Sequence, residues 1–215
     1  MGTDIYMMAE HRIKGKWYTV TDEVFPGYGD SLTHCPYPFR NYDLFAILAD
    51  VRNGVGFAGC PTGERFNPIE DNSKGLPKDI NPRTLDGLCD GYGTSWFTLK
   101  ELKNYDWTQK NKTFGFLSEK EYANSVAQGK HPTSWCSWIQ GDGIKIVSET
   151  QMKKIIKGTA KREKGITYYC ECWFPAQTYA QAAGTFYTDT MPILESLIPE
   201  GGSDEDVRIV FNFDC

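Results

Sequence analysis

The sequence has little that would support nucleophilic catalysis. Only three histidines, His11, His34 and His131, occur in 215 residues, which leaves few general bases for acid–base chemistry. There is no Gly-x-Ser-x-Gly segment, and no expected strand leads into the glycine-rich turn of a Rossmann or P-loop site. Each histidine is typical of a surface or structural position. The sequence therefore identifies no catalytic residue and gives no reason to expect a cofactor.

Ordered metal-ligand spacings are also missing. The seven cysteines are an odd number at irregular spacings without a Cys-x-x-Cys pair, so we expect all seven to be free thiols. A zinc site that combines them with histidines lacks the usual ligand spacing. A carboxylate site for a hard cation is the other alternative, although no spacing brings its oxygens together; the candidates are Asp43, Asp50, Asp71, Asp79 and Asp142. The sequence predicts no metal site.

The N-terminal segment lacks a basic region followed by an apolar run, and no window approaches the length of a membrane span. We therefore expect a cytoplasmic protein with no membrane partner. The net charge of −5 and the pI near 5.3 argue against binding to a long nucleic-acid backbone, which requires a basic footprint. A small anionic ligand remains compatible, because two or three Arg or Lys side chains suffice for one phosphate.

Hydrophobic periodicity predicts strands near both ends of the chain, at 4–13, 17–21, 166–174 and 207–213. Helices are expected between them. We predict an α+β fold in one compact domain over 1–215: an antiparallel sheet built from the N- and C-terminal strands, packed by helices, with a long irregular region at 54–94. The aromatic share of 14% fits either an aromatic core or a pocket lined with rings.

Three serine or threonine caps predict where helices begin. Thr98 with Glu101 predicts a helix over 99–104, and Ser118 with Glu121 predicts one that stops before Gly129. The pattern at 148–151 predicts a helix closed by Gly158, and a long helix is expected from 178, interrupted near Pro192. The basic stretch 153–164 is typical of a solvated helix end, with phosphate binding as the alternative.

The block from Arg40 to Gly59 has the densest set of candidate binding groups. An amphipathic helix carries polar residues at both ends and runs into a glycine-rich loop. Arg forks suit phosphate and carboxylate, and Asn can bind a base edge or a ribose. In the alternative reading the same side chains cap the helix and bridge it to the sheet. The predicted ligand-binding residues are Arg40, Asn41, Asp43, Arg52, Asn53 and Trp96.

Several segments together resemble a family of uncharacterised proteins common in bacteriophage genomes and prophages. They span most of the chain: the block from Arg40 to Gly59, Ser95-Trp-Phe-Thr-Leu-Lys-Glu-Leu102, Tyr105-Asp-Trp107 and the ending 206–214. In that family, His often stands after Asp-Ile and before Ser-Trp. Here Tyr6 and the segment 92–94 occupy those places, which weakens an enzymatic interpretation of this chain.

The resemblance implies a small accessory protein that acts against host defence in the cytoplasm of an infected cell. We expect it to bind and sequester a small nucleotide-type immune signal, with aromatic rings stacked on a base and Arg or Lys on the phosphates. The alternatives are an enzyme that hydrolyses a phosphodiester or nucleotide signal, and a protein–protein inhibitor of a host factor. A homo-oligomer is compatible with each of these functions.

Overall fold

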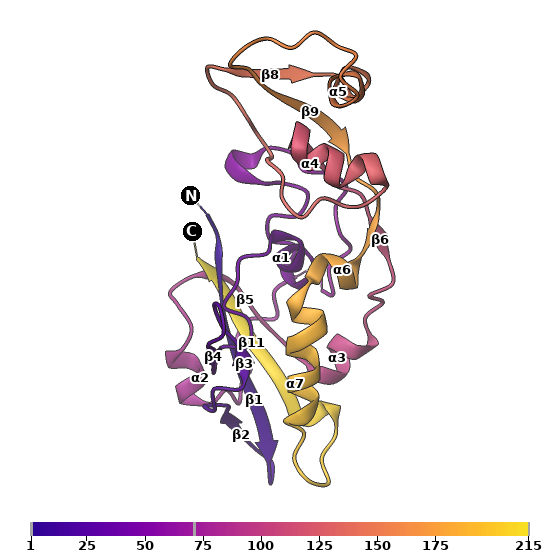
Figure 1. The fold of residues 1–215 in the computed structure, drawn as a ribbon. Helices are drawn as coiled ribbons and strands as arrows, with labels where there is room; N and C mark the ends of the chain where they lie inside the picture. Colours follow the sequence, from indigo (N-terminus) through magenta and orange to yellow (C-terminus); the bar gives the residue numbers. More distant parts are fainter. Residues whose placement is uncertain (1, 71, 215) are drawn as a thin grey trace. The chain divides into compact units, whose positions relative to one another are not determined.

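The structure, a computed structural model, describes residues 2–70 and 72–214. It combines helices with largely antiparallel sheets, which confirms the α+β fold class. The chain divides into two compact units (Figure 1): unit 1 comprises 1–53, 66–109 and 179–215, and unit 2 comprises 54–65 and 110–178. The single domain over 1–215 stays a prediction.

Unit 1 is built on a four-stranded antiparallel sheet in the order β2-β1-β11-β5. Its strands are β1 (Asp4–Ile13), β2 (Lys16–Thr19), β5 (Tyr92–Thr98) and β11 (Val207–Asp214). β1 pairs with β11 from Asp4 opposite Asp214 to His11 opposite Val207. The prediction that both ends of the chain share one sheet is confirmed.

Helices pack against one face of this sheet and form the main core with it. They are α1 (Tyr42–Ala49), α3 (Leu99–Asn104), α6 (Tyr179–Ala183), the π-helical turn η3 (Phe186–Thr190) and α7 (Met191–Ser196). Phe45 of α1 meets Phe213 of β11 with ring centroids 5.2 Å apart, and both side chains are fully buried. Period-2 alternation puts most apolar residues of β1 and β11 on this face. The other face carries the polar residues Glu10, Arg208 and Asn212, together with Met8 and Val210.

α1 is shorter than the sequence pattern predicts. It begins after Asn41, whose side chain accepts hydrogen bonds from the N–H groups of Asp43 and Leu44, as an N-cap residue does. It ends at Ala49 because Asp50 has a left-handed backbone with φ of 58°. Arg52 has the same unusual sign of φ. These two conformations turn the chain out of the helix before residue 53.

The remaining elements of unit 1 are short: β3 (Phe25–Pro26), β4 (Leu32–Thr33), α2 (Pro82–Asp86) and the 3₁₀ turn η4 (Asp204–Asp206). The region predicted to be irregular is divided between the units, because 54–65 belongs to unit 2. Within it, the Asn81 side chain caps α2 and Pro82 starts it. β5 begins at Tyr92, near the end of this region.

Unit 2 contains a three-stranded sheet in the order β7-β9-β8. Its elements are β7 (Phe114–Ser118), β8 (Ile144–Val147), β9 (Thr167–Trp173), α4 (Glu119–Asn124), α5 (Glu149–Ile156), the short pair β6 (Lys110–Asn111) with β10 (Gln177–Thr178), and the 3₁₀ turns η1 (Phe57–Gly59) and η2 (Val126–Gln128). β8 runs parallel to β9, and this second sheet is separate from the antiparallel sheet that the sequence predicts from the terminal strands. A second core lies between β9 and helices α4 and α5, with Tyr122, Met152 and Cys170 at its centre.

Local signals were reliable in both units. The Thr98–Glu101 and Ser118–Glu121 capping boxes are both formed, at the first turns of α3 and α4. Six of the seven cysteines are free thiols, and Cys215 lies outside the described residues. Within the described part of the chain, no helix is long and apolar enough to cross a membrane.

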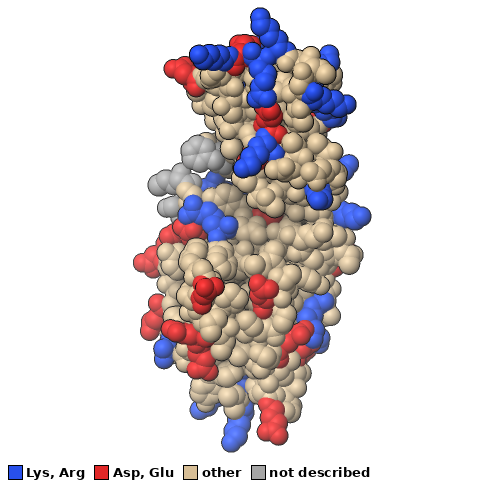
Figure 2. All heavy atoms as spheres, in the orientation of Figure 1, with Lys and Arg blue, Asp and Glu red and all other residues tan. Residues whose placement is uncertain are grey.

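The two units differ strongly in charge. Unit 1 contains 11 Lys and Arg against 21 Asp and Glu, a net charge of −10, whereas unit 2 contains 12 against 7, a net charge of +5. Figure 2 shows Lys and Arg gathered on the visible surface around α5. The net charge of −5 for the whole chain is therefore the sum of an acidic unit and a basic one.

Candidate functional site

The predicted residues before α1 are held by neighbours within unit 1. Arg40 forms a bidentate ion pair with Asp4, with Nε–Oδ1 and Nη2–Oδ2 distances of 2.9 and 2.7 Å. The hydrogen bond from Arg40 lowers the pKa of the Asp4 carboxyl. Asn41 caps α1 and donates its Nδ2 to the Ala182 carbonyl at 2.8 Å. Asp43 lies half-buried in the first turn of α1.

The predicted residues after α1 are also engaged. Asn53 is buried, and its side chain hydrogen-bonds both backbone groups of Phe66. It donates to the Phe66 carbonyl at 2.8 Å and accepts from the Phe66 N–H at 2.7 Å. Asn53 also donates to the Asp50 carboxylate at 2.6 Å. Arg52 donates its Nε to the Thr3 hydroxyl at 3.0 Å. These contacts join the end of α1 to neighbouring segments, and ligand binding by the same residues stays a prediction.

Replacement of Arg52 separates the two interpretations of this residue. We expect Arg52→Ala to lower the free energy of unfolding by about 1–2 kcal/mol, because a half-buried hydrogen bond to Thr3 and a contact with the Tyr42 ring are lost. Thermal or denaturant unfolding measures this change. Unchanged stability together with weaker ligand binding would instead place Arg52 in a ligand site, as the sequence pattern alone suggests.

Trp96 lies elsewhere in unit 1, on the face of the sheet that carries the polar residues. Cross-strand pairing puts Glu10, Arg208 and Thr98 side by side on this face. Trp96 precedes Thr98 by two residues in β5, so it lies on the same face. A cavity of about 490 Å³ opens here. It is lined by Arg12, Trp17, Asp79, Trp96, Lys100 and Arg208, among others.

Arg208 forms the floor of this cavity. Its side chain is 2% exposed and donates Nε to the fully buried Glu10 carboxylate at 2.6 Å. Its Nη1 donates to Asp79 at 2.8 Å. Partial burial of Asp79 would raise the pKa of its carboxyl, but the hydrogen bond and charge of Arg208 outweigh this and keep that pKa below its usual value. The guanidinium is thus fixed by two carboxylates from different segments.

Cations and indole rings alternate from this face to the edge strand β5, where Lys74 lies against both Trp96 and Phe97. The Arg208 guanidinium lies 3.9 Å from the Trp17 ring centroid and 5.6 Å from that of Trp96. Arg12 lies 5.3 Å from Trp17, and the Lys74 ammonium lies 4.7 Å from Trp96. Each distance is within the range of cation–π attraction. We call these residues, Arg12, Trp17, Arg208, Trp96 and Lys74, the cation–indole ladder.

The rim of the cavity carries cations in ion pairs that are partly or fully exposed. Arg12 pairs with Asp206 at 2.7 Å, and Lys100 pairs with Glu205. Pairs of this kind contribute about 0–1 kcal/mol, because water screens both charges. Arg12 and Lys100 can therefore exchange their carboxylate partners for an incoming anion at small cost.

Sequence patterns found one member of the ladder and missed four. Trp96 was included among the predicted ligand contacts, and Trp17 and Arg208 were assigned to strands without a role. The available signal was a charged residue at a position that alternates with the apolar core residues, as at Glu10 in β1 and Arg208 in β11. Their partnership could not be seen locally, because 198 residues separate them.

The other candidate groups do not converge on a metal. Among the described residues, no group of three or more His, Cys, Asp or Glu side chains could hold a metal ion, and Asp71 lies outside them. In the basic stretch, Lys153 pairs with Glu149 and Arg162 with Glu119. Arg40 lines a separate hollow of about 550 Å³ along β1 in unit 1. The cavity with the cation–indole ladder is therefore the strongest candidate site of unit 1.

Comparison with protein-family models, curated proteins and solved structures finds no match to this chain.

Proposed function

We propose that the protein captures a small, flat, anionic ligand of nucleotide type in the cavity of unit 1. The observation that carries the proposal is a buried guanidinium between two indole rings, with further cations at the rim. Ligand cavities typically combine rings with a few convergent polar groups. The cavity of about 490 Å³ falls within the usual range of about 300–1,000 Å³ for small-molecule sites.

The Trp96 ring supports the recognition of a planar base. It is half-buried, so part of its surface remains available to a ligand. Stacking of a base on an aromatic side chain contributes about 1–3 kcal/mol and tolerates different bases. The carboxylates of Asp79 and Glu101 also line the cavity, and they can accept hydrogen bonds from the exocyclic amines of a base.

Arg12 and Lys100 support the recognition of phosphate. Lys100 is held in an exposed ion pair, and Arg12 is held by a partly exposed pair with Asp206 and by its contact with the Trp17 ring; opening an exposed pair costs about 0–1 kcal/mol. Their hydrogen bonds to a phosphate are charge-assisted on both sides and therefore stronger than neutral ones. An anionic ligand would interact with Arg12 and Lys100 more strongly than their present surface carboxylate partners do.

The resemblance to bacteriophage accessory proteins supplies the biological setting of the proposal. A binding protein of this kind would act in the cytoplasm of an infected host cell and withdraw a nucleotide immune signal from its receptor. The alternative is hydrolysis of the same signal. Incubation with a nucleotide, denaturation and chromatography of the released material separate the two, since a binding protein returns the ligand intact.

The binding site is tested by replacing Trp96. We expect Trp96→Ala to weaken the affinity for the best-binding member of a panel of nucleoside phosphates and cyclic dinucleotides by at least about tenfold, because one stacking surface is lost. Isothermal titration calorimetry measures the affinity. Trp138→Ala is the matched control, because Trp138 is 60% exposed and does not line the cavity.

Two outcomes would contradict the proposal. One is that no member of the panel binds the unaltered protein. The other is that Trp96→Ala and Trp138→Ala reduce the affinity equally. A thermal melt of each variant confirms that the fold persists, and Trp96→Phe is expected to retain most of the affinity because it keeps an aromatic face.

A further inference from the structure

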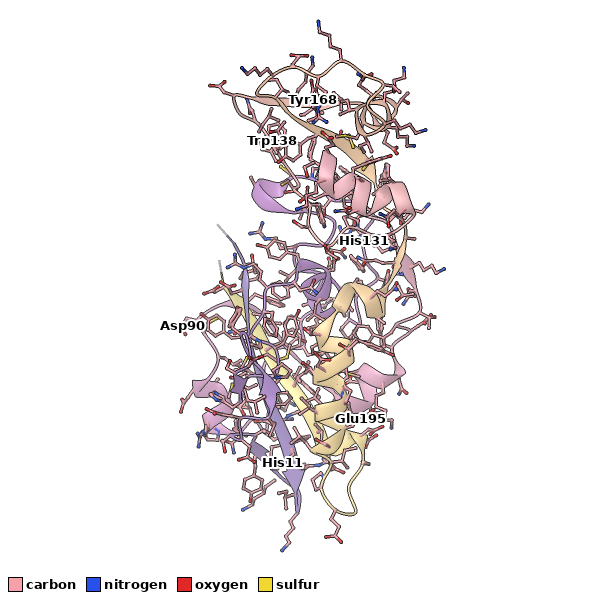
Figure 3. The ribbon with its side chains drawn as sticks, viewed as in Figure 1. His11, Asp90, His131, Trp138, Tyr168 and Glu195 are labelled. Carbon is pink, nitrogen blue, oxygen red and sulfur yellow. The ribbon has the colours of Figure 1, made fainter. Side chains whose placement is uncertain are left out.

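Unit 2 contains a cavity of its own, of about 410 Å³. One wall is α4 with its flanking residues, and the other is the loop 130–134. Figure 3 shows His131, which belongs to this loop, close to α4. Most of the lining side chains are polar, and they include Ser118, Lys120, Asn124, Lys130, Thr133 and Ser134. A cavity lined in this way suits a polar ligand better than an apolar one.

The loop that forms one wall is held in place before any ligand arrives. The Nδ1 of His131 lies 2.9 Å from the Pro132 carbonyl, which can only accept, so Nδ1 carries the proton. Its Nε2 lies 3.0 Å from the Thr113 hydroxyl. The Phe174 ring packs edge-on against both His131 and Trp135. A preformed wall reduces the ordering cost of binding.

The charges around the cavity favour an anion. Neither Lys120 nor Lys130 forms an ion pair within residues 2–70 and 72–214. The carboxylate that lines the cavity, Glu121, is engaged at the start of α4, where its Oε2 accepts the Ser118 N–H at 2.9 Å. Burial lowers the pKa of His131, because it disfavours the charged form of the ring. The local balance is therefore positive, in a unit whose net charge is +5.

Hydroxyl donors complete the lining. Thr133 and Ser134 make no side-chain hydrogen bond to any described residue, so their protons are available. The Ser118 hydroxyl accepts the Glu121 N–H at 3.4 Å and keeps its own proton for donation. A phosphate group has several strong acceptor oxygens, which two ammonium groups and three hydroxyls can satisfy together.

We propose that this cavity is a binding site for a phosphate group, supplied by inorganic phosphate or by a phosphate monoester. Lys120 and Lys130 provide the charge, and the hydroxyls of Ser118, Thr133 and Ser134 provide further donors. The site lies wholly within unit 2. It does not depend on the function proposed for the cavity of unit 1.

The experiment follows the ring proton of His131 by NMR during titration with inorganic phosphate at constant ionic strength. We expect a saturable shift of this resonance. Lys120→Ala and Lys130→Ala should each weaken phosphate binding about tenfold, because a charged hydrogen-bond partner is lost. Lys157→Ala is the matched control, since it removes the same charge from unit 2 at a position outside the cavity.

AMP serves as a second probe. Tighter binding of AMP than of phosphate identifies an ester as the preferred source of the group, and tighter binding of phosphate identifies the free ion. The proposal is overturned if the His131 resonance does not saturate. It is also overturned if Lys157→Ala weakens binding as much as the two cavity variants, because the effect is then one of general charge. Trp96→Ala should leave the phosphate titration of His131 unchanged. The proposals for the cavities of unit 1 and unit 2 can therefore be refuted independently.

Discussion

Arg208→Met is expected to lower the free energy of unfolding by about 3–5 kcal/mol, because it would leave the buried Glu10 carboxylate without its compensating charge. Among the described residues, the other Glu10 oxygen accepts only the Asn81 N–H, at 2.8 Å, which cannot neutralise the charge. Denaturant unfolding monitored by circular dichroism measures the loss. Methionine retains much of the volume of the arginine stem, so the comparison isolates the charge from the packing.

Two further variants test the physical reason. Arg12→Ala removes an exposed ion pair on the same sheet face and should cost about 1 kcal/mol or less. Glu10→Gln combined with Arg208→Met should be less destabilising than the sum of the single changes, because the charge that needs compensation is gone. Equal losses for Arg208→Met and Arg12→Ala would show that burial of the Glu10–Arg208 pair is energetically unimportant.

The second large effect on the free energy of unfolding is expected for Asn53→Ala. We expect a loss of about 3 kcal/mol, because the N–H and carbonyl groups of Phe66 would both lose their partner in a buried setting. Asn104→Ala is the control, since Asn104 is an exposed asparagine in the same unit, and it should change stability by about 0.5 kcal/mol or less. Unfolding curves of the two variants give the difference directly.

The outcome for Asn53 bears on the interpretation of the helix ends. A large loss identifies Asn53 as part of the scaffold that closes α1 onto Phe66. A small loss would mean that solvent satisfies the Phe66 backbone groups in the variant. The Asn53 side chain of the unaltered protein would then be available to contact a ligand. Asn41, with its cap on α1 and its bond to Ala182, can be examined in the same way.

Residues at the two ends of α1 show why a binding site is difficult to identify from sequence. Arg and Asn side chains suit a phosphate or a base, and they equally suit a backbone carbonyl or a helix N-terminus. Asn41 and Asn53 bind backbone groups, and Arg40 binds Asp4. The choice depends on what the fold places opposite each side chain, and local sequence does not contain that information.

The sequence by itself determined the features that depend on near neighbours. The apolar alternation at 4–13 and 207–213 predicted strands β1 and β11, and the capping boxes at Thr98 and Ser118 located the starts of α3 and α4. These signals work because side chains two residues apart share a strand face, and a cap residue reaches the N–H three residues ahead. They were sufficient for the fold class and for a sheet built from both termini.

The tertiary structure alone decided how distant segments combine. Parallel pairing of β8 with β9, division into an acidic and a basic unit, and assembly of the cation–indole ladder all join segments far apart in the chain. Glu10 and Arg208 are each only an outward charge on a strand until the β1–β11 register sets them opposite one another. That register is selected by the packing of the entire core. The candidate sites could therefore be identified only from the tertiary structure.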